Sequence, residues 1–475
     1  MTKRIAIVTV VATDSSEALV QTAESLVKQT VPCIHYCVVI RQRCSLITPG
    51  TAIRIDLPLA DNQLLLARAI GLQLAFNEGA EIAACLEPGE IAEPQCGQFV
   101  ANELEKTAVD ILELRHPDHG NAQLGRLFYS KKAAFMPALW GQIHPIDEAF
   151  ATPIINQVIA KHGVSRRLIV AALISPTDSG PSTKVIPFGM PLSDERFIRR
   201  LYQQTGLLFG RVQRTRARKV NSVAVITPYY KESLTKLQRC HQSVMRQGSN
   251  VQHYMIADGC PQAELNQWDI THIALPQAHC DNGNTPRGIG GMIAFAKGFD
   301  ALAYLDADNW FGDGHIDSMR QTQHHTGASV VCSWRTVVLP DGTVVEGLDP
   351  EDKKKTHVDT SCYLITREVA FLASLWARMP QVLGPICDRI FFGGASEAEP
   401  NIAWTNKRTT FFESNYRLHY KMAGKVPEGP VHDIPPNLWR EMDPHEFRER
   451  TGKTITLVRG QSAFSRSKKR PKVLS

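Results

Sequence analysis

The sequence lacks the features of a membrane-spanning or secreted protein. No apolar run approaches the ~18 consecutive residues that a transmembrane helix needs. Residues 1–8 lead directly into a β-strand pattern, without the apolar core or small-residue cleavage site of a signal peptide. The 11 cysteines form no Cys-x-x-Cys pair and are odd in number, which favours reduced thiols over zinc ligands or disulfides. These absences predict a cytoplasmic protein.

An excess of one charge is also lacking. The net charge of +6 is small for 475 residues, so it does not indicate a nucleic-acid partner. The hydrophobic content of 43% and the charged content of 21% are those of an ordinary globular protein. A chain of this length forms two domains or three.

The first part of the chain predicts an α/β fold. Residues 5–11 form a β-branched apolar run, 16–28 an amphipathic helix, and 34–40 a second strand. A strand, a helix and a strand with short connections make a βαβ unit, so we expect a parallel sheet. A breaker-rich stretch, 176–182, ends this domain, which we place at residues 1–182.

The same pattern begins again at Asn221. Residues 223–227 repeat the apolar run at 5–9. Such matches at a near-constant offset predict two tandem copies of one fold, although two unrelated α/β domains with similar apolar periodicity remain the alternative. Ser243, Gln247 and His253 fall 218 residues after Ser25, Gln29 and His35, and Arg287, Gly290 and Leu305 fall 219 residues after Arg68, Gly71 and Leu86.

The two copies differ at their polar positions. The segment Asp306-Ala307-Asp308 aligns with Glu87-Pro88-Gly89, and Asp258 aligns with Ile40. We therefore expect residues 1–182 to be a degenerate copy with a structural, docking or acceptor-binding role. A metal site at Glu87 and Glu90 is the alternative for this copy.

Two basic segments flank the second copy. Residues 183–220 are Arg-rich with a helical pattern, and they indicate either a solvated connecting helix or an interfacial helix on anionic lipid. Residues 431–475 form a C-terminal extension whose basic end, 465–475, is predicted to be disordered. Peripheral contact with the inner face of a membrane is therefore one expectation. A homo-oligomer is compatible with the sequence.

The second copy, residues 221–430, contains a predicted strand that ends in two carboxylates. Residues 301–305 are apolar, and Asp306 and Asp308 follow at once. Charges at the rim of a core need a partner, and a divalent cation is the usual one. Asp258 follows an earlier predicted strand, 252–257, where it indicates either a contact with a base or ribose or a plain turn.

Two further segments predict contacts with a nucleotide. Loops at the carboxyl ends of parallel strands bind ligands, which brings in Thr227, Pro228, Tyr229 and Glu232. Tyr229 could offer a ring face to a base. The glycine-rich residues 281–291 precede a helix predicted at 292–299, and Arg287 could supply charge to a phosphate. Their spacing is not that of the GxGxxG fingerprint.

These motifs together resemble the GT-A fold glycosyltransferases of family 2. The motifs are Val225-Ile226-Thr227-Pro228-Tyr229-Tyr230, Cys240–Gln247, Ala257-Asp258-Gly259, Arg287-Gly288-Ile289-Gly290 and Tyr304–Asp308. The resemblance implies two tandem nucleotide-diphospho-sugar transferase domains with Rossmann-like, mostly parallel sheets. It implies that Thr227, Pro228, Tyr229, Glu232, Asp258, Arg287 and Asp306 bind the donor nucleotide, and that Asp306 and Asp308 hold Mn²⁺ or Mg²⁺.

The resemblance extends to the acceptor side. Residues 384–392 resemble the segment that carries the catalytic base, which makes Asp388 the candidate base, with a helix N-cap as the alternative. Tyr416-Arg417-Leu418-His419 resembles a Tyr-Arg-x-His segment whose His419 would reach the metal or diphosphate. The chain departs from the family at Ala257 and at Cys387. The mixed-charge loop 349–355 is a solvated face or a mobile lid.

Three functions are compatible with this pattern. The first is a metal-dependent, inverting, hexosyltransferase-like glycosyltransferase that moves a sugar from a nucleotide-sugar to a saccharide or lipid-linked saccharide in bacterial surface glycan synthesis. The second is a sugar nucleotidyltransferase. The third is a non-catalytic scaffold that binds nucleotide-sugar.

Overall fold

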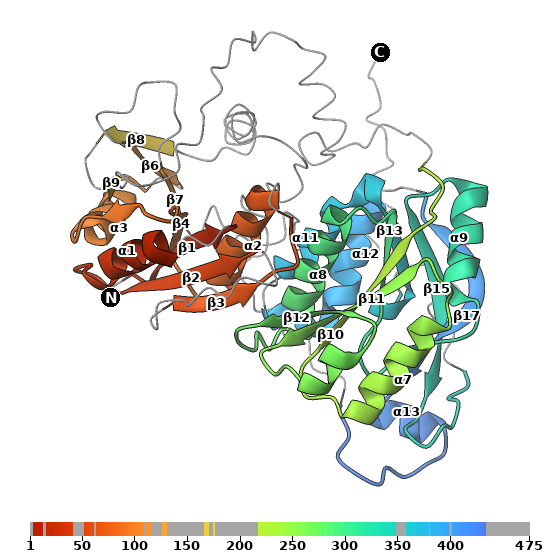
Figure 1. Ribbon diagram of the computed structural model, residues 1–475. Helices are drawn as coiled ribbons and strands as arrows, with labels where there is room; N and C mark the ends of the chain where they lie inside the picture. Colours follow the sequence, from red (N-terminus) through yellow and green to blue (C-terminus); the bar gives the residue numbers. More distant parts are fainter. Residues whose placement is uncertain are drawn as a thin grey trace, which may run out of the picture. The chain divides into compact units, whose positions relative to one another are not determined.

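The computed structural model divides the chain into two compact units (Figure 1). The first comprises residues 1–209 with 273–276, and the second residues 210–272 with 277–475. The structure describes residues 3–12, 16–40, 52–60, 63–108, 111–115, 126–130, 166–170, 174–175, 217–347, 358–379, 381–398 and 401–433. Most of the predicted basic linker, the loop at 349–355 and the tail beyond 433 lie outside the described residues. None of the described helices has the length and apolarity to cross a bilayer.

The first unit contains a seven-stranded mixed sheet in the order β3-β2-β1-β4-β7-β6-β8. Its β1, β2 and β4 are parallel, as the βαβ pattern predicts, and β7 is antiparallel to β4. The strands are β1 (Ile5–Val11), β2 (Cys33–Val39), β3 (Ala52–Asp56), β4 (Ile82–Cys85), β6 (Ile111–Arg115), β7 (Arg126–Ser130) and β8 (Arg166–Val170), with β5 (Ile91–Ala92) paired to β9 (Ile174–Ser175). The helices are α1 (Ser16–Val27), α2 (Leu64–Asn77) and α3 (Cys96–Thr107).

The second sheet has eight strands in the order β12-β11-β10-β13-β16-β15-β17-β14 and belongs to the second unit, except that residues 273–275 of β12 fall in the range grouped with the first unit. The strands are β10 (Val223–Tyr229), β11 (Val251–Asp258), β12 (Thr271–Leu275), β13 (Ala301–Tyr304), β14 (Trp310–Phe311), β15 (Val330–Val338), β16 (Tyr363–Thr366) and β17 (Ala403–Glu413). The helices are α7 (Leu234–Met245), α8 (Asn284–Ala296), α9 (His315–Thr326), α11 (Phe371–Ala377), α12 (Cys387–Ala398) and α13 (Arg417–Met422), with 3-10 turns η3 (Ala263–Gln267), η4 (Thr360–Cys362), η5 (Arg367–Val369) and η6 (Gln381–Ile386).

The two sheets have the same strand order over seven strands. The central strand is the first of each unit, β1 or β10, and it lies between the second and fourth strands of that unit. The fourth strand is antiparallel to its outer neighbour in both sheets, and β6–β8 and β15–β17 are both parallel pairs. The protein is therefore an α/β protein with two mixed sheets of one topology.

Buried side chains make the same hydrogen bonds in both units. His35 Nε2 lies 3.0 Å from Thr9 Oγ1, and His253 Nε2 lies 2.9 Å from Thr227 Oγ1. In each case a histidine of the second strand contacts a threonine of the first. Burial lowers the pKa of His35 to about 4 and that of His253 well below its usual value, so both rings are neutral.

A glutamine after the first helix also has the same role in both units. Gln29 donates to the carbonyl of Glu93 at 2.8 Å, and its side-chain oxygen accepts from the amide of Gly97 at 2.9 Å. Gln247 accepts from the amide of Ile316 at 3.1 Å with its own side-chain oxygen. Each glutamine thus satisfies a first-turn amide of the helix that follows the short fifth strand. Polar contacts as well as apolar periodicity are therefore repeated.

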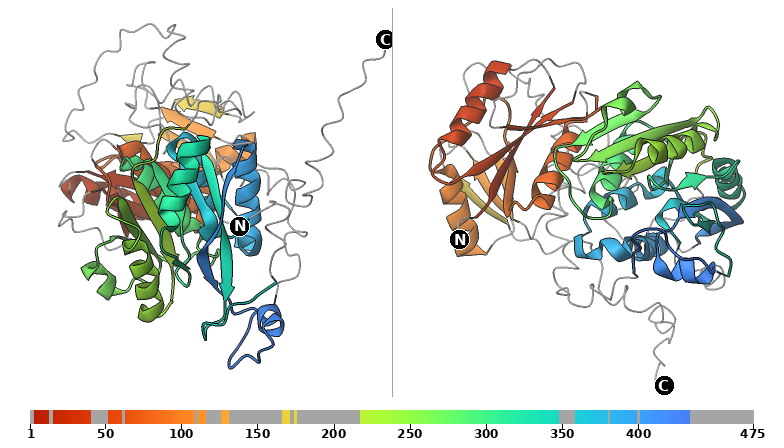
Figure 2. Two further views of the ribbon diagram at one scale, coloured as in Figure 1. Left: turned by 90° about the vertical axis from the view of Figure 1, so that its right-hand side faces the viewer. Right: turned by 90° about the horizontal axis from the view of Figure 1, so that it is seen from below.

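Helices cover both faces of the second sheet (Figure 2). Val223 and Val225 of β10 share a core cluster with residues of α7 and α9. The alternate residue Ile226 lies against Gly290 of α8, on the opposite face. Both faces of β10 are thus buried, as the sequence predicts for a central parallel strand.

Helix α8 begins at Asn284, whereas the sequence analysis expected a glycine-rich loop as far as Met292. The glycines are helical because neighbouring elements approach them closely. A Cβ at Gly288 would lie 2.6 Å from the backbone nitrogen of Ala377, and one at Gly291 would lie 3.0 Å from Cβ of Ala373. The glycines therefore serve helix packing rather than loop conformation.

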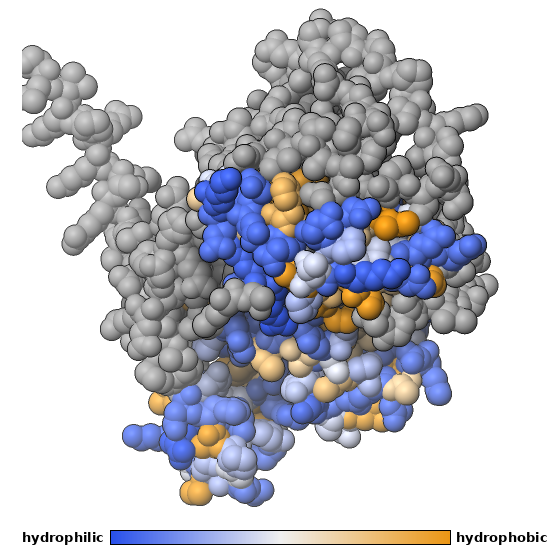
Figure 3. Space-filling view, turned by 90° about the vertical axis from the view of Figure 1, so that its left-hand side faces the viewer, coloured by the Kyte–Doolittle hydropathy of each residue, from blue (hydrophilic) through white to orange (hydrophobic). Residues whose placement is uncertain are grey.

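Figure 3 shows the hydropathy of the described residues on one face of the molecule. Its coloured side chains are mainly hydrophilic, with the hydrophobic ones in small groups between them. Scattered apolar side chains of this kind are normal on a protein surface.

Substitution of the equivalent glycines Gly71 and Gly290 by alanine should destabilise each unit by about 1–3 kcal/mol. A Cβ would lie 2.5 Å from Val8 Cγ1 in the first case and 2.5 Å from Ile256 Cδ1 in the second. Gly393→Ala is the matched control, because a Cβ there meets nothing within 4 Å and should be neutral or stabilising. Denaturant unfolding measures the difference, and equal stability of all three variants would contradict the packing described above.

Candidate active site

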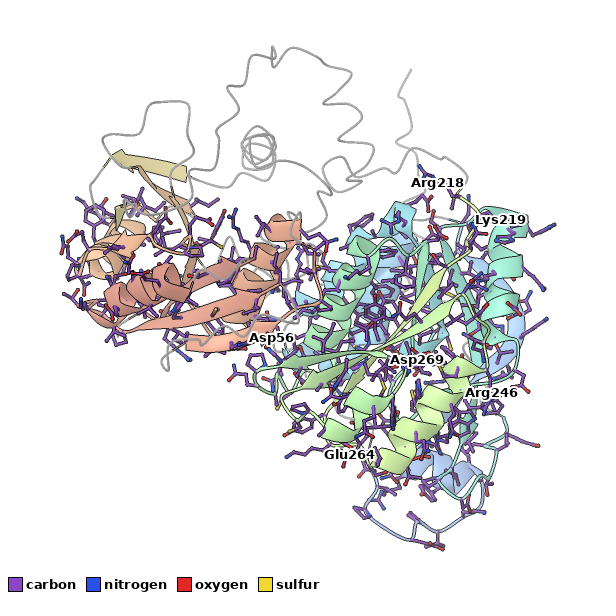
Figure 4. The ribbon with its side chains drawn as sticks, viewed as in Figure 1. Asp56, Arg218, Lys219, Arg246, Glu264 and Asp269 are labelled. Carbon is purple, nitrogen blue, oxygen red and sulfur yellow. The ribbon has the colours of Figure 1, made fainter. Side chains whose placement is uncertain are left out.

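The candidate site lies at the carboxyl end of the second sheet. Strands β10, β11 and β13 are parallel, so the residues that follow them meet at one edge. In Figure 4, Arg218 and Lys219, which precede β10, mark the opposite end of the sheet from Glu264, which follows β11. The predicted residues Glu232, Asp258, Asp306 and Asp308 all belong to the Glu264 end.

Asp306 forms a buried ion pair with Arg287. Arg287 Nη2 donates to Asp306 Oδ1 at 2.6 Å, and Nη1 donates to Asn284 Oδ1 at 3.0 Å. The guanidinium is only 2% exposed and stacks over Trp376 at 4.8 Å, whereas the Asp306 side chain is 29% exposed. Burial raises the pKa of Asp306, and Arg287 opposes that rise. Arg287 thus pairs with Asp306 from the buried side of the carboxylate, and its own charge does not face solvent.

The first unit contains the same ion pair. Arg68 Nη2 donates to Glu87 Oε1 at 2.6 Å, with side-chain exposures of 15% and 34%. Glu90, the other predicted metal ligand of this unit, accepts from the amide of Glu87 at 2.8 Å. Both carboxylates are engaged within the protein.

Asp308 differs from Asp306 because no described residue donates a hydrogen bond to its carboxylate. Burial raises the pKa of Asp308 to about 7, and the negative charge of Asp306 adds to the effect. The charge of Lys236 opposes this rise, but no described residue forms an ion pair with the carboxylate, so a bound cation would supply further positive charge there. The aligned residue of the first unit is Gly89.

The turn that carries Asp308 is fastened to helix α7. Arg239 Nη2 donates to the carbonyl of Asp308 at 2.7 Å, and its guanidinium lies 4.2 Å from the Trp310 ring centroid. Glu413 pairs with Arg239 at 2.8 Å and with Lys236 at 2.7 Å. The sequence analysis missed these residues, because their partners lie far apart in the chain.

Two predicted donor-binding residues lie beneath the edge of the sheet. Thr227 is fully buried against His253, and Tyr229 is 2% exposed with its hydroxyl 2.8 Å from His272 Nε2. Both belong to β10, so their side chains fill the core and the ring of Tyr229 does not face solvent. The exposed aromatic residue is Tyr230, 36% accessible, which the sequence analysis did not single out. Its place just after the buried strand, at the start of the loop, was the signal that could have found it.

Pro228 and Glu232 lie at the expected edge. Pro228 is in contact range of the Gly283 position, where a Cβ would lie 2.9 Å from its Cγ. Glu232 Oε2 accepts from the amide of Tyr230 at 2.7 Å, and its charge raises the pKa values of Asp306 and Asp308. Glu232 is therefore part of the acidic group at this edge.

Asp258 is engaged by a neighbouring loop. Its carboxylate accepts from His279 Nδ1 at 2.6 Å and from the His279 amide at 3.1 Å. Both side chains are buried, and Gly259 adopts a φ of 77° with its Cα close to the backbone of Gln277 and Ala278. The structure shows Asp258 as an anchor for this loop, and contact with a base would require exchange of that partner.

Asp388 lies in the first turn of α12, one residue after the start of the helix. Its Oδ1 accepts from the amide of Arg389 at 2.7 Å, so it acts within the first turn rather than as the N-cap. Burial raises the pKa of Asp388 to about 6; the charge of Asp359 adds to this rise, and Arg335 opposes it. A carboxyl group in this range can accept a proton near neutral pH.

His419 is not brought into a three-ligand set with the aspartates. Its Nδ1 lies 2.5 Å from Ser414 Oγ, and burial lowers its pKa. Within the described part of the chain, no three His, Cys, Asp or Glu side chains converge in a way that could hold a metal ion. The predicted ligands Asp306 and Asp308 share one turn, and His419 belongs to α13.

Part of the chain is similar in structure to S. aureus TarS. The similarity covers 42% of this chain and 38% of that one, with a TM-score of 0.33 and 13% identity. The structure of TarS 1-349 in complex with UDP matches 42% of this chain with a TM-score of 0.33 and 12% sequence identity. The structure of TarS 1-349 in complex with UDP-GlcNAc matches 44% of this chain with a TM-score of 0.30 and 10% sequence identity. The alignments span 63% and 62% of those two chains. No family model and no curated protein matches the sequence.

Replacement of Asp308 by asparagine should stabilise the metal-free protein at pH 8. The folded state binds the Asp308 proton more tightly than the unfolded chain, so ionisation between about pH 4 and pH 7 reduces stability. The gain should be about 2 kcal/mol at pH 8 and smaller at pH 5. Thermal unfolding in EDTA measures it, with Asp313→Asn as the control, because the Asp313 side chain is 93% exposed. A gain that does not depend on pH would contradict this account of Asp308.

Proposed function

We propose that the second unit is a glycosyltransferase that uses a nucleotide-sugar donor. The observation that carries the proposal is the pair of carboxylates at the carboxyl edge of the sheet. Asp306 is held from below by Arg287, while Asp308 is half-buried with no hydrogen-bond donor from the described residues. Such a pair suits a ligand that brings positive charge to the edge, as a metal–diphosphate does.

The cation of this proposal is Mn²⁺ or Mg²⁺. These cations are commonly bound by one or two carboxylates, with phosphate oxygens and water completing the shell. The second oxygen of Asp306 and the carboxylate of Asp308 fit that role, and His419 is the third residue proposed to reach the metal or diphosphate. When bound, the cation would neutralise negative charge on the departing nucleoside diphosphate.

The residues on the nucleotide side are proposed to orient the donor. Tyr230 offers an exposed ring beside Glu232, and Lys231 Nζ lies 4.7 Å from the centroid of that ring. Pro228 shapes the adjoining loop. Thr227, Tyr229, Asp258 and Arg287 are proposed to support these residues from inside the unit.

Asp388 is proposed as the base that takes the proton from the acceptor hydroxyl in an inverting displacement. As that hydroxyl attacks the anomeric carbon, the sugar–phosphate bond breaks and the proton moves to the Asp388 carboxylate. Its pKa of about 6 leaves it ionised at neutral pH and able to accept the proton. The proposed acceptor is a saccharide or a lipid-linked saccharide of a bacterial surface glycan, reached in the cytoplasm or at the inner membrane face.

The first unit is proposed to have a structural, docking or acceptor-binding role. It retains the ion pair of Arg68 and Glu87 but has Gly89 where the second unit has Asp308. The carboxylate that lacks a partner is therefore present in one unit and missing from the aligned position of the other.

The full chain, incubated with Mn²⁺ and a panel of UDP-, GDP-, CDP- and dTDP-sugars, should release free nucleoside diphosphate from one of them. Asp308→Ala should lower that rate about a hundredfold, because the metal loses a ligand. Asp313→Ala, an exposed carboxylate beyond the same turn, should leave the rate unchanged. Release of pyrophosphate from a sugar phosphate and a nucleoside triphosphate would instead identify a nucleotidyltransferase. Donor binding without turnover would identify a scaffold.

Asp388→Asn should lower the transfer rate by about 10²–10⁴-fold and leave donor binding intact, because the amide cannot accept the proton. In the unmodified protein the rate should rise with pH through about pH 6 as the Asp388 carboxyl ionises. The pH profile of kcat/KM measures this limb. Full activity of the asparagine variant would remove Asp388 from the role of base.

A further inference from the structure

A short buried segment, Asp359–Tyr363, contacts the backbone amide of Asp306, the residue that carries the candidate metal-side carboxylate. Ser361 is fully buried, and its Oγ accepts from the amide of Asp306 at 3.1 Å and from Asn309 Nδ2 at 3.0 Å. Asp359 caps the turn η4, since its Oδ1 accepts from the amide of Ser361 at 2.9 Å. The position of the Asp306 backbone is therefore tied to the conformation of this turn.

The same segment also contacts the candidate base. Tyr363, the first residue of β16, donates its hydroxyl to the main-chain carbonyl of Asp388 at 3.3 Å. Its ring is buried and packs edge-on against Phe391 of α12 at 5.0 Å between centroids. Ser361 and Tyr363, two residues apart in this segment, thus contact the backbone of Asp306 and of Asp388.

Arg335 of β15 pairs with the capping residue of the segment. Its Nη1 donates to Asp359 Oδ2 at 2.7 Å, and its guanidinium lies 4.7 Å from the centroid of Phe412. The side chains of Arg335 and Asp359 are 21% and 9% exposed, so solvent screens their charges only partly. The pair therefore places one positive and one negative charge beside the site.

We propose that Asp359, Ser361 and Tyr363 form a positioning element that sets the distance between the metal-side carboxylate and the base, and that Arg335 is its charge partner. This proposal rests on the proposed function. None of these residues needs to touch the substrate. They act through Asp306 and Asp388, so that a change at one end of the segment reaches the other.

The charges of the pair act on Asp388 in opposite directions. Asp359 raises the pKa of Asp388 and Arg335 lowers it. Within the described part of the chain, the other titratable groups that interact with Asp388 come from its own helix, from β16 and from the residue before α13. They are Cys387, Arg389, Tyr363 and Tyr416.

Opposite shifts of the pH profile test the charge role. Asp359→Asn should move the acidic limb of kcat/KM to lower pH by about half a unit or more, and Arg335→Gln should move it to higher pH by a similar amount. Asp359→Glu keeps the charge and should leave the limb near its original position. Limbs that move in the same direction, or do not move, would overturn the charge role, because a purely structural loss predicts no opposite signs.

Tyr363→Phe tests the link to the base. It should lower kcat by about 2- to 10-fold, the effect of one hydrogen bond, and leave the affinity for nucleoside diphosphate with Mn²⁺ unchanged. An unchanged kcat, or an equal loss of affinity, would overturn the link.

A separate readout distinguishes failure of this inference from failure of the proposed function. If no donor is turned over, the Asp388 carboxyl can be titrated by NMR after ¹³C labelling of aspartate, with Asp388→Asn assigning the signal. The inference then predicts the same opposite shifts for Asp359→Asn and Arg335→Gln. Absence of those shifts would overturn it, whatever reaction the protein catalyses.

Discussion

The site of the second unit depends on the buried ion pair between Arg287 and Asp306. Arg287 is almost wholly inaccessible, and loss of its carboxylate partner would leave a charge inside the protein at a cost of about 3–5 kcal/mol. The pair therefore fixes the position of the Asp306 carboxylate, and a substitution of Asp306 would also lower the stability of the fold. Among the described residues Asp308 has no such partner, so a change at its carboxylate breaks no buried ion pair.

The two units have the same polar framework but differ within the candidate site. The buried His–Thr contact, the Gln that caps a following helix and the Arg–carboxylate pair all recur at equivalent positions. These contacts satisfy buried polar groups, so their loss would cost stability in either unit. The Asp308 carboxylate makes no such contact with the described residues. The aligned residue of the first unit is Gly89, whose amide donates to Thr22 Oγ1 at 2.9 Å and whose φ is 94°. Framework residues and ligand-binding residues are thus separable within one strand end.

The sequence predicted features that depend on neighbouring residues, and it did not predict contacts between segments that lie far apart in the chain. The first two strands of each unit, the strand before Asp306, the repeat and the place of Asp306 and Asp308 at a strand end followed from apolar periodicity and a constant offset. The helical state of the glycine-rich segment did not, because helix packing overrides the turn preference of glycine.

Side-chain placement within the candidate site was less predictable. The pairing of Asp258 with His279, 21 residues away, and the bridge from Ser361 to Asp306, 55 residues away, leave no periodic signal in one sequence. Tyr229 and Tyr230 illustrate the limit, since Tyr229, the last residue of β10, is buried, whereas Tyr230, the next residue beyond the strand, is exposed.

The most direct test of a single nucleotide site in a chain with two similar units is the stoichiometry of binding. Calorimetric titration with the nucleoside diphosphate of the preferred donor, in the presence of Mn²⁺, should give one equivalent per chain. Binding should be lost in Asp308→Ala and retained in Glu87→Gln. Two equivalents per chain, or binding that survives Asp308→Ala and is lost in Glu87→Gln, would contradict the assignment of the site to the second unit.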